Sequence, residues 1–475
     1  MKRVALWLTV WVGALGSLCA GGVWAQAQPP LPPQVQAALA RAQVPSQALA
    51  VWVAPVQQPQ TPRLAYRAHE SMNPASLMKL VTTSAALDML GLGWSWSTPV
   101  YLDAPVREGV LQGHVYIRGQ GDPKLVVERL WLLLLRLRSL GLRQINGDIV
   151  LDQSAFEVQA ADAASFDGEP LRPYNAAPAA LLINYTSLAL TFTPDSRAGV
   201  ATVHMLPPLA GVQVPAHVPL STQGGCGDWR SALKADFSDP ARLRISGTYP
   251  ASCGEKSWSV AYADPASYAQ RAVQGMWQVV GGGLSGQVRQ GKVPAGLAPA
   301  FEQGSPGLPE VIRDINKFSN NVMAQQLFLT LSLQEQGVGT LARSRQRVRS
   351  WWAARLGEAD APVLDNGSGL SRSERISAQA LGRLLHSAWA APWMPELLAS
   401  LPVTGVDGTL RRSQAQAAGA AHLKTGSLRD VAGIAGVVDA ASGQRYVLVA
   451  IVNHPNAAAA RPALDALIDW TAQER

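Results

Sequence analysis

The stretch Ser76-Leu77-Met78-Lys79 decides how this chain is to be interpreted, and Ser319-Asn320-Asn321 and Lys424-Thr425-Gly426 follow it in order. In the first stretch a lysine follows a serine by three positions. On a helix both side chains lie on one face, so the amine can reach the hydroxyl group. A serine needs a base to attack an acyl group, and a lysine can serve only when it is neutral. Each stretch alone is weak evidence, but the three together indicate acyl transfer.

The two later stretches would complete such a site. Ser319 can pass a proton to a leaving amine, and Asn321 can hold a substrate amide. Lys424 and Thr425 offer an ammonium and a hydroxyl group to a carboxylate. Burial and a second cation nearby both lower the pKa of a lysine, so Lys424 would help to keep Lys79 neutral.

Gly426 and Ser427 would add backbone groups to the site. A glycine lets the chain approach a substrate closely. The N–H groups of Ser427 and Ser76 would form an oxyanion hole, which is a pair of donors aimed at the negative oxygen of an acyl-transfer intermediate. Ordinary structural roles compete with these assignments, because Ser-Asn-Asn also caps helices and Lys-Thr-Gly also ends strands.

The N-terminus predicts export. Lys2 and Arg3 form a basic start, residues 4–18 are almost wholly apolar, and Val23-Trp24-Ala25 offers a small-residue cleavage site. We therefore expect residues 1–25 to be a signal peptide and the mature protein to work in the periplasm. A retained membrane anchor is the alternative.

The cysteines favour one disulfide bond. Cys19 follows Gly16-Ser17-Leu18, which is a poor lipobox, so we expect it to leave with the signal peptide. Cys226 and Cys253 remain, and an even pair in an exported chain indicates a bridge rather than a metal site. The seven histidines show no HExxH spacing, and we expect neither a metal nor another cofactor.

The charge of the chain says little about its partners. The formal net charge is +7, which suits a protein near anionic envelope polymers but is common. A basic cluster stands beside two tryptophans, and a solvated helix face is favoured there over peripheral membrane contact. The cluster consists of Arg343, Arg345, Arg347 and Arg349, followed by Trp351 and Trp352.

The spacing of the three signatures divides the chain. At 475 residues it is too long for one ordinary domain. The gap between the first and second signatures is more than twice the gap between the second and third, so inserted structure must loop out if they share one cleft. Residues 97–259 alternate short β-like runs with turn residues, as antiparallel sheets do. We expect them to be an inserted β-rich part, with residues 28–96 and 260–475 forming the catalytic core.

The core sequence predicts an α/β (α+β) fold. Residues 48–53 predict a strand, and Asn73-Pro74 predicts the start of a helix that runs to about Leu90 and stops at Gly91. A sheet covered by helices, assembled from both ends of the chain, is the simplest arrangement. The other predicted elements are helices at 309–317, after Ser319 to about 334 and at 457–471, and a hairpin of residues 433–439 and 445–453.

Longer strings around the signatures make a resemblance specific. They are Asn73–Leu80, Gly119–Pro123, Asp365–Arg372, Leu401–Thr409 and Lys424–Leu428. The signatures themselves are those known for class A β-lactamases and penicillin-binding proteins. With these strings, the chain resembles the serine D-alanyl-D-alanine carboxypeptidases and endopeptidases of the penicillin-binding protein 4 type, over essentially its whole mature length.

The resemblance implies both a fold and a reaction. The fold would be a penicillin-binding-protein/β-lactamase-like core of sheet and helices with a large β-rich insertion. Ser76 would be the acyl-enzyme nucleophile, Lys79 the proton acceptor, Ser319 the relay and Lys424 the carboxylate binder. The partners would be stem peptides and cross-links of peptidoglycan, with β-lactams as covalent inhibitors and no nucleic acid. The balance between carboxypeptidase and endopeptidase activity stays open.

Two charged residues are candidates for a pocket that receives a substrate side chain. Arg429 follows the Lys-Thr-Gly stretch at the expected rim of the cleft, where it would read a carboxylate or simply face water. Asp152 in the insertion would meet a substrate ammonium, although an aspartate at a strand end more often caps a turn.

Other functions share parts of this pattern. A class A β-lactamase has its signatures closer together and needs a deacylating glutamate in an E-x-x-L-N context, which this sequence lacks. A class C type enzyme or esterase would normally carry tyrosine in place of Ser319. A non-catalytic cell-wall-binding scaffold would be expected to have lost Ser76, Lys79 or Lys424, and all three are present.

Overall fold

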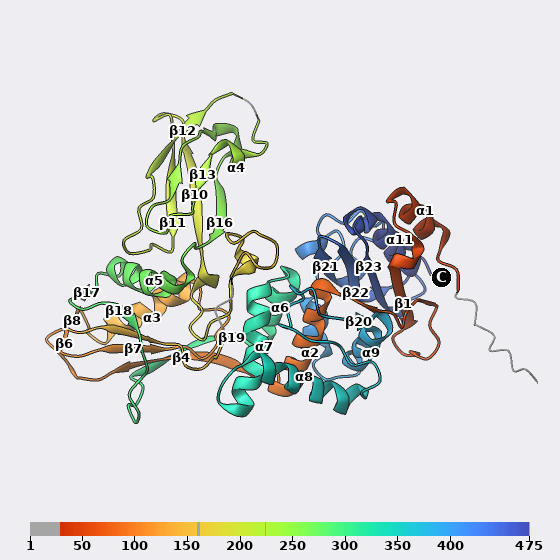
Figure 1. Ribbon diagram of the computed structural model, residues 1–475, viewed down its shortest axis with the longest axis horizontal. Helices are drawn as coiled ribbons and strands as arrows, with labels where there is room; N and C mark the ends of the chain where they lie inside the picture. Colours follow the sequence, from red (N-terminus) through yellow and green to blue (C-terminus); the bar gives the residue numbers. More distant parts are fainter. Residues whose placement is uncertain (1–28, 159–161, 224, 475) are drawn as a thin grey trace, which may run out of the picture.

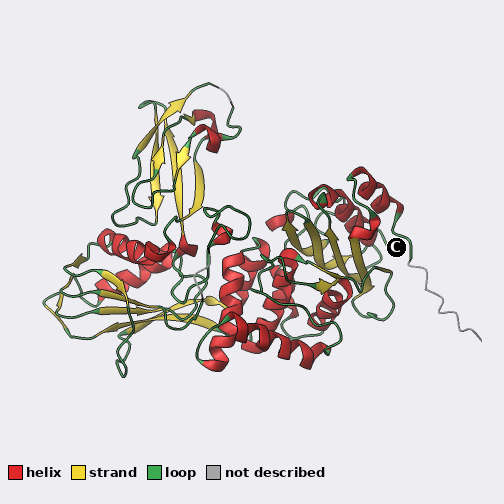
Figure 2. Cartoon of the chain, in the orientation of Figure 1, coloured by secondary structure: helices red, strands yellow, loops and turns green. Residues whose placement is uncertain are grey.

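The computed structural model describes residues 29–158, 162–223 and 225–474, and shows a body of sheet and helices beside two further β-rich parts (Figure 1, Figure 2). The predicted signal peptide, with Cys19, lies outside these residues. None of the helices within them is both long and apolar enough to cross a membrane.

The central sheet of the body combines strands from both ends of the chain, as predicted. The strand near the N-terminus pairs antiparallel with the last strand, and the predicted C-terminal hairpin is formed. This confirms the α/β character of the core. Across the sheet, the strands are β2 (Leu64–Tyr66), β1 (Leu49–Pro55), β23 (Arg445–Asn453), β22 (Val431–Asp439) and β21 (Ala421–Leu428).

Helices cover both faces of this sheet. Alternate residues of a strand point to opposite faces. In β1, Leu49, Val51 and Val53 pack with α1 (Pro33–Arg41) and α11 (Arg461–Ala472). The residues between them belong to a second apolar cluster on the other face. Its helices are α2 (Met78–Leu90), α6 (Leu308–Lys317), α7 (Asn321–Gln336), α8 (Leu341–Leu356), α9 (Ala378–Trp389) and α10 (Met394–Ser400).

Helix α2 runs through the middle of the second cluster. Every residue from Met78 to Leu87 is buried, as expected for a helix surrounded on all sides. It contacts α6, α7, α8 and α9, and Figure 1 shows this early helix among helices that come far later in the chain. It ends at Gly91 with φ +81°, the predicted stop. The small pair β3 (Ser71–Met72) and β20 (Ile376–Ser377) lies just before α2 and α9.

The insertion has two five-stranded sheets and two smaller ones. The first packs against α3 (Val127–Ser139) and α5 (Pro265–Val279). Its strands, in order, are β18 (Val288–Gln290), β9 (Ile149–Asp152), β7 (Val115–Arg118), β4 (Ser95–Leu102) and β19 (Phe301–Gly307). A smaller sheet beside it consists of β17 (Gly283–Leu284), β8 (Gln144–Ile145), β6 (Val110–Leu111) and β5 (Val106–Arg107).

The second sheet stands away from the core, at the top of Figure 1. Its strands are β15 (Tyr249–Pro250), β12 (His217–Ser221), β11 (Val200–Leu206), β10 (Ser187–Asp195) and β16 (Lys256–Ala261). Close to it are the pair β13 (Ala235–Asp236) and β14 (Arg244–Ile245) and the single-turn helix α4 (Trp229–Ala232).

The segment after residue 259 packs with the insertion instead of the core. Strand β19 pairs antiparallel with β4, and β18 pairs parallel with β9. Phe301 belongs to the same apolar cluster as Val100. We therefore propose that the insertion spans about residues 95–307, and not 97–259 as the β-like runs suggested. The sequence placed the boundary near residue 260 because α5 has a helical pattern, unlike the β-like runs before it. In the structure, the apolar face of α5 packs against the inserted strands.

Cys226 and Cys253 form the predicted disulfide bond, with their sulfur atoms 2.07 Å apart. The bond joins the segment before α4 to the turn after β15. Cys253 is buried in the apolar cluster of the insertion. The bridge therefore belongs to the part of the insertion that carries α4, at the top of Figure 1.

Replacing both cysteines by alanine opens a link between residues 27 positions apart. On the chain-entropy model this should lower the free energy of unfolding by about 3–4 kcal/mol, measured by denaturant titration. Thiol counting on the native exported protein is the control. Two reactive thiols there would contradict the bond.

Candidate active site

The turn that carries Ser76 is held by two asparagines. Ser76 lies in a short 3-10 turn, Ala75–Leu77, that leads into α2. The Asn73 side chain accepts a hydrogen bond from the Ala75 N–H at 2.9 Å, and the Asn453 side chain exchanges two hydrogen bonds with the Asn73 backbone. Ala75 has φ +48°, which is uncommon for a residue with a side chain. These contacts therefore hold Ala75, and with it the turn that carries Ser76, in a conformation that the chain would not favour alone.

Lys79 lies one helical turn after Ser76 and is fully buried. Its Nζ is 2.9 Å from Ser76 Oγ, as the spacing predicted. It also donates to Asn321 Oδ1 at 2.6 Å and to the Ser368 carbonyl oxygen at 2.5 Å. The amine is thus surrounded by three oxygen atoms from three separate segments of the chain.

Burial sets the protonation of the two lysines of the site. Desolvation lowers the pKa of Lys79 well below its ordinary value, the charge of Lys424 lowers it further, and the carboxyl group of Glu374 opposes both. Burial also lowers the pKa of Lys424 to about 7. Neutral amines are therefore accessible near neutral pH, which is what a lysine base requires.

Lys424 connects the third signature to the second. Its Nζ donates to Ser319 Oγ at 2.9 Å and to the Thr425 carbonyl oxygen at 2.8 Å. Ser319 occupies the bend between α6 and α7 with φ +56°. The side chain of Asn320 caps α7 by accepting from the Met323 N–H at 3.0 Å. Because Asn320 performs the capping, the Ser319 and Asn321 side chains remain available to the two lysines.

Strand β21 lies directly against the turn that carries Ser76. A Cβ atom at Gly426 would lie 2.6 Å from the Pro74 carbonyl oxygen, so only glycine fits this close approach. Next to it, the Thr425 hydroxyl is 2.7 Å from that of Thr409. Ser427 follows on the same strand and is exposed. The residues predicted from the third signature therefore line one edge of the site.

The two candidates for a side-chain pocket do not join this cluster. The carboxylate of Asp152, at the end of β9, accepts from the backbone N–H groups of Ser154 and Val293, each at 2.9 Å. Burial raises the pKa of Asp152, but these hydrogen bonds outweigh it and the net pKa is lowered. Arg429 is exposed in the turn between β21 and β22. Within the described part of the chain, no hydrogen bond or ion pair connects the two.

The loop of residues 365–372 also belongs to the site, although its sequence predicted no role for it. A Cβ atom at Gly369 would lie 1.9 Å from the Ala75 carbonyl oxygen, so the loop is pressed onto the turn that carries Ser76. Its Ser368 carbonyl receives Lys79. Closely spaced glycines often mark such approaches, and this is the signal that the sequence offered.

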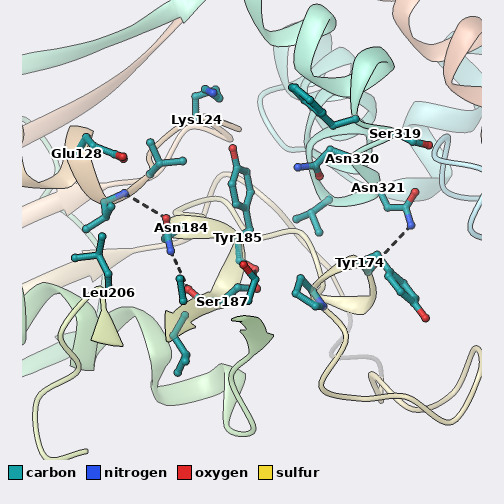
Figure 3. A pocket seen from close by; sticks show the side chains of 18 residues that line it. Lys124, Glu128, Tyr174, Asn184, Tyr185, Ser187, Leu206, Ser319, Asn320 and Asn321 are labelled. Carbon is teal, nitrogen blue, oxygen red and sulfur yellow. Dashed lines mark hydrogen bonds between the residues drawn. The ribbon is translucent and has the colours of Figure 1, made fainter. Parts of the chain in front are cut away.

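A cavity of about 730 Å³ opens beside Ser319 and Asn321 (Figure 3). Tyr185, from the insertion, lies between its two walls in this view. Phe318, next to Ser319, lines the cavity and is 67 % exposed. The site therefore has space for a substrate that extends beyond the reacting bond. Other lining residues include Lys124, Glu128, Tyr174, Asn184 and Leu206.

The chain matches known proteins along most of its length. Residues 31–474 match the model of the D-Ala-D-Ala carboxypeptidase 3 (S13) family. The chain is 29 % identical to the D-alanyl-D-alanine carboxypeptidase of an Actinomadura species, over 81 % of this chain and 74 % of that protein. It is 25 % identical to the D-alanyl-D-alanine carboxypeptidase DacB of Haemophilus influenzae, over 82 % of each chain.

Solved structures share the fold. The crystal structure of penicillin binding protein 4 from Haemophilus influenzae superposes with a TM-score of 0.71, at 22 % identity, over 91 % of this chain and 99 % of that one. A peptidoglycan endopeptidase from Bdellovibrio bacteriovorus superposes with a TM-score of 0.51, at 15 % identity, over 89 % and 92 %. Because the family model spans nearly the whole described chain, this protein belongs to the D-Ala-D-Ala carboxypeptidase 3 (S13) family.

Proposed function

We propose that this chain is a periplasmic serine DD-peptidase that cleaves D-Ala-D-Ala termini and peptide cross-links of peptidoglycan through an acyl-enzyme on Ser76. Membership of a D-Ala-D-Ala carboxypeptidase family supports the substrate class. The predicted signal peptide supports the compartment. One protein of this fold is known in complex with a β-lactam and another is acylated by penicillin G, which supports β-lactams as covalent inhibitors.

The surroundings of the Lys79 amine are the observation that carries this proposal. A neutral amine has two N–H donors and one lone pair. Asn321 Oδ1 and the Ser368 carbonyl are acceptors only, so they take the two donors. The lone pair is then left for the proton of the Ser76 hydroxyl, 2.9 Å away. The site is thus arranged for a lysine that accepts a proton from the nucleophile.

The proposed reaction proceeds in two stages. Ser76 Oγ attacks the carbonyl carbon of the penultimate D-Ala while Lys79 takes its proton. The N–H groups of Ser76 and Ser427 stabilise the negative oxygen. The C–N bond then breaks, and the leaving amine receives a proton from the Ser319 hydroxyl, which Lys424 can resupply through their 2.9 Å hydrogen bond. Water finally attacks the ester and gives a proton through Ser319 to Lys424, while Lys79 returns its proton to Ser76 Oγ as the shortened peptide leaves, so both lysines and Ser76 are restored.

The cavity beside Ser319 supports the cleavage of cross-links as well as of free termini. A cross-link carries a second stem peptide on the leaving amine, and this peptide needs room next to the group that protonates it. The cavity meets that requirement, and Phe318 offers an exposed ring at its edge. We therefore assign the leaving stem peptide to this cavity.

Labelled penicillin should attach to Ser76, because Lys79 activates that hydroxyl alone. Ser76→Ala should abolish labelling without unfolding the protein, as followed by gel fluorescence and thermal melting. Ser442→Ala, in a surface turn, is the matched control and should keep its label. A peptide adduct mapped by mass spectrometry to another serine, such as Ser368, would refute the mechanism.

Amidation of the carboxylate next to the scissile bond should slow cleavage. A hydrogen bond to an ionised group contributes about 1.5–3 kcal/mol, which is roughly ten- to a hundred-fold in rate. Lys424→Ala should largely erase the ratio between acid and amide substrates, whatever its absolute activity. Equal cleavage of acid and amide by the wild type would show that Lys424 serves only the proton chemistry.

Phe318→Ala should lower kcat/KM for cross-linked muropeptides more than for uncross-linked pentapeptides, by roughly three- to ten-fold, since an aromatic contact is worth about 0.5–1.5 kcal/mol. Mass spectrometry of the products measures both rates in one mixture. Val279→Ala, at an equally exposed apolar position on α5, should leave the ratio unchanged. Equal losses on both substrates in the Phe318 variant would exclude the cavity as the site of the leaving peptide.

A further inference from the structure

Glu374 is a fully buried carboxyl group that the proposed reaction does not use. It lies just before β20. Its Oε1 accepts hydrogen bonds from the backbone N–H groups of Asp365 at 3.1 Å and Gly367 at 2.9 Å. Its Oε2 has no hydrogen-bond partner among the described residues. A buried carboxylate with one bare oxygen is costly to ionise, so a role beyond packing is indicated.

The backbone that Glu374 holds is the backbone that receives Lys79. Gly367, whose N–H binds Glu374, is joined by one peptide bond to Ser368, whose carbonyl accepts from Lys79. The Gly367 carbonyl accepts from Thr82 Oγ1 at 2.6 Å, one turn further along α2. Glu374 therefore holds the loop through its N–H groups, while α2 holds it through its carbonyl groups.

The charges around Glu374 couple it to the same amine. The pKa of Glu374 is raised to about 7 overall: burial raises it most, the two backbone hydrogen bonds lower it, the charge of Asp365 raises it and that of Lys79 lowers it. Asp365 is itself paired with Arg345 of α8 at 2.7 Å. Arg375 donates to backbone carbonyls, including that of Glu374. Lys79 is thus the cation of the site whose charge acts on the Glu374 carboxyl group.

The coupling acts in both directions, because a negative charge on Glu374 favours the protonated form of Lys79. Lys424, on the other side of Lys79, has the opposite effect. When Glu374 carries a proton, Lys79 is more easily neutral. When Glu374 is ionised, Lys79 holds its proton to higher pH.

We propose that Glu374 is a positioning residue for acylation: its carboxyl group fixes the loop that receives Lys79, and its charge sets the pH range in which Lys79 can accept the Ser76 proton. The inference rests on the proposed role of Lys79 as the base. Glu374 would contribute in two ways: Oε1 accepts the hydrogen bonds that fix the loop, and the charge acts on Lys79. Different substitutions remove these two contributions.

The test is the pH dependence of the acylation rate constant, measured with a fluorescent penicillin on the full mature chain. Glu374→Gln keeps an oxygen that can accept both N–H groups but has no charge. The pKa of Lys79 then falls, and the acidic limb of the profile should move to lower pH by roughly one unit, with the plateau largely kept. Glu374→Asp keeps the charge on a shorter side chain. The plateau value of the rate constant should therefore fall, while the acidic limb stays at the wild-type pH.

Two further variants complete the comparison. Glu374→Ala removes both contributions and should lower the plateau by roughly ten- to a hundred-fold, because a small misplacement of a reacting group is costly. Glu335→Gln removes a surface carboxylate that pairs with Arg347 and should reproduce the wild-type profile. Thermal melting verifies that each variant is folded. If Glu374→Ala does not fold, the profiles of Glu374→Gln and Glu374→Asp test the inference alone.

The outcomes are distinguishable. A Glu374→Gln profile that coincides with the wild-type profile, while Ser76 is still acylated, would overturn this inference and leave the proposed function intact. If the acidic limb shifts by the same amount in Glu374→Gln and Glu374→Asp, the shift comes from loop geometry. That result would overturn the proposed effect of the Glu374 charge. A wild-type protein that no penicillin acylates at any pH would overturn the proposed function and this inference with it.

Discussion

The burial of the Lys79 amine is the constraint on which the rest of the site depends. A lysine in water is almost entirely protonated at neutral pH and cannot take a proton from a serine. Full burial, with a second buried lysine nearby, removes that obstacle. The burial in turn requires that the polar atoms around the amine be hydrogen-bonded, because a buried polar group without a hydrogen-bond partner costs free energy. Asn321 and the Ser368 carbonyl meet this requirement.

The fold provides the burial by surrounding α2 on every side. This helix starts at the nucleophile and runs between helices from the later half of the chain, while β21 closes the remaining edge. Gly426 and Gly369 allow two backbone segments to approach the turn of Ser76 from different directions. The insertion contributes Tyr185 and other lining residues to the neighbouring cavity. Core and insertion therefore both line this cavity, whereas the residues around the Lys79 amine come from the core.

Much of this arrangement was predictable from the sequence because it depends on local patterns. The spacing of Ser76 and Lys79, the stop at Gly91 and the C-terminal hairpin follow from helix and strand periodicity. The disulfide bond followed from the number of cysteines that remain after export. Ser319 was predicted with an alternative role as a helix cap, and the structure gives that role to Asn320 instead.

Features that depend on tertiary packing were not predictable in the same way. The extent of the insertion depends on which sheet α5 packs against, and no periodicity reveals a helix's partner. Glu374 would be taken for an ordinary surface residue, since glutamate is rarely fully buried. Its contact with the loop of Gly367 exists only once the chain has folded. Asp152 was considered for substrate binding, whereas its carboxylate is occupied by two backbone N–H groups.

Titration of the Lys79 amine itself tests the central claim most directly. Carbon-13 NMR of protein labelled at the lysine ε-carbons, with the Lys79 resonance assigned through a Lys79→Met variant, reports its protonation as a function of pH. If Lys79 is the base, its amine should titrate well below the usual lysine value of about 10.4 and be substantially neutral in the working pH range. A Lys79 resonance that titrates near about 10.4 would show a permanently charged amine, and Lys79 could not then be the base.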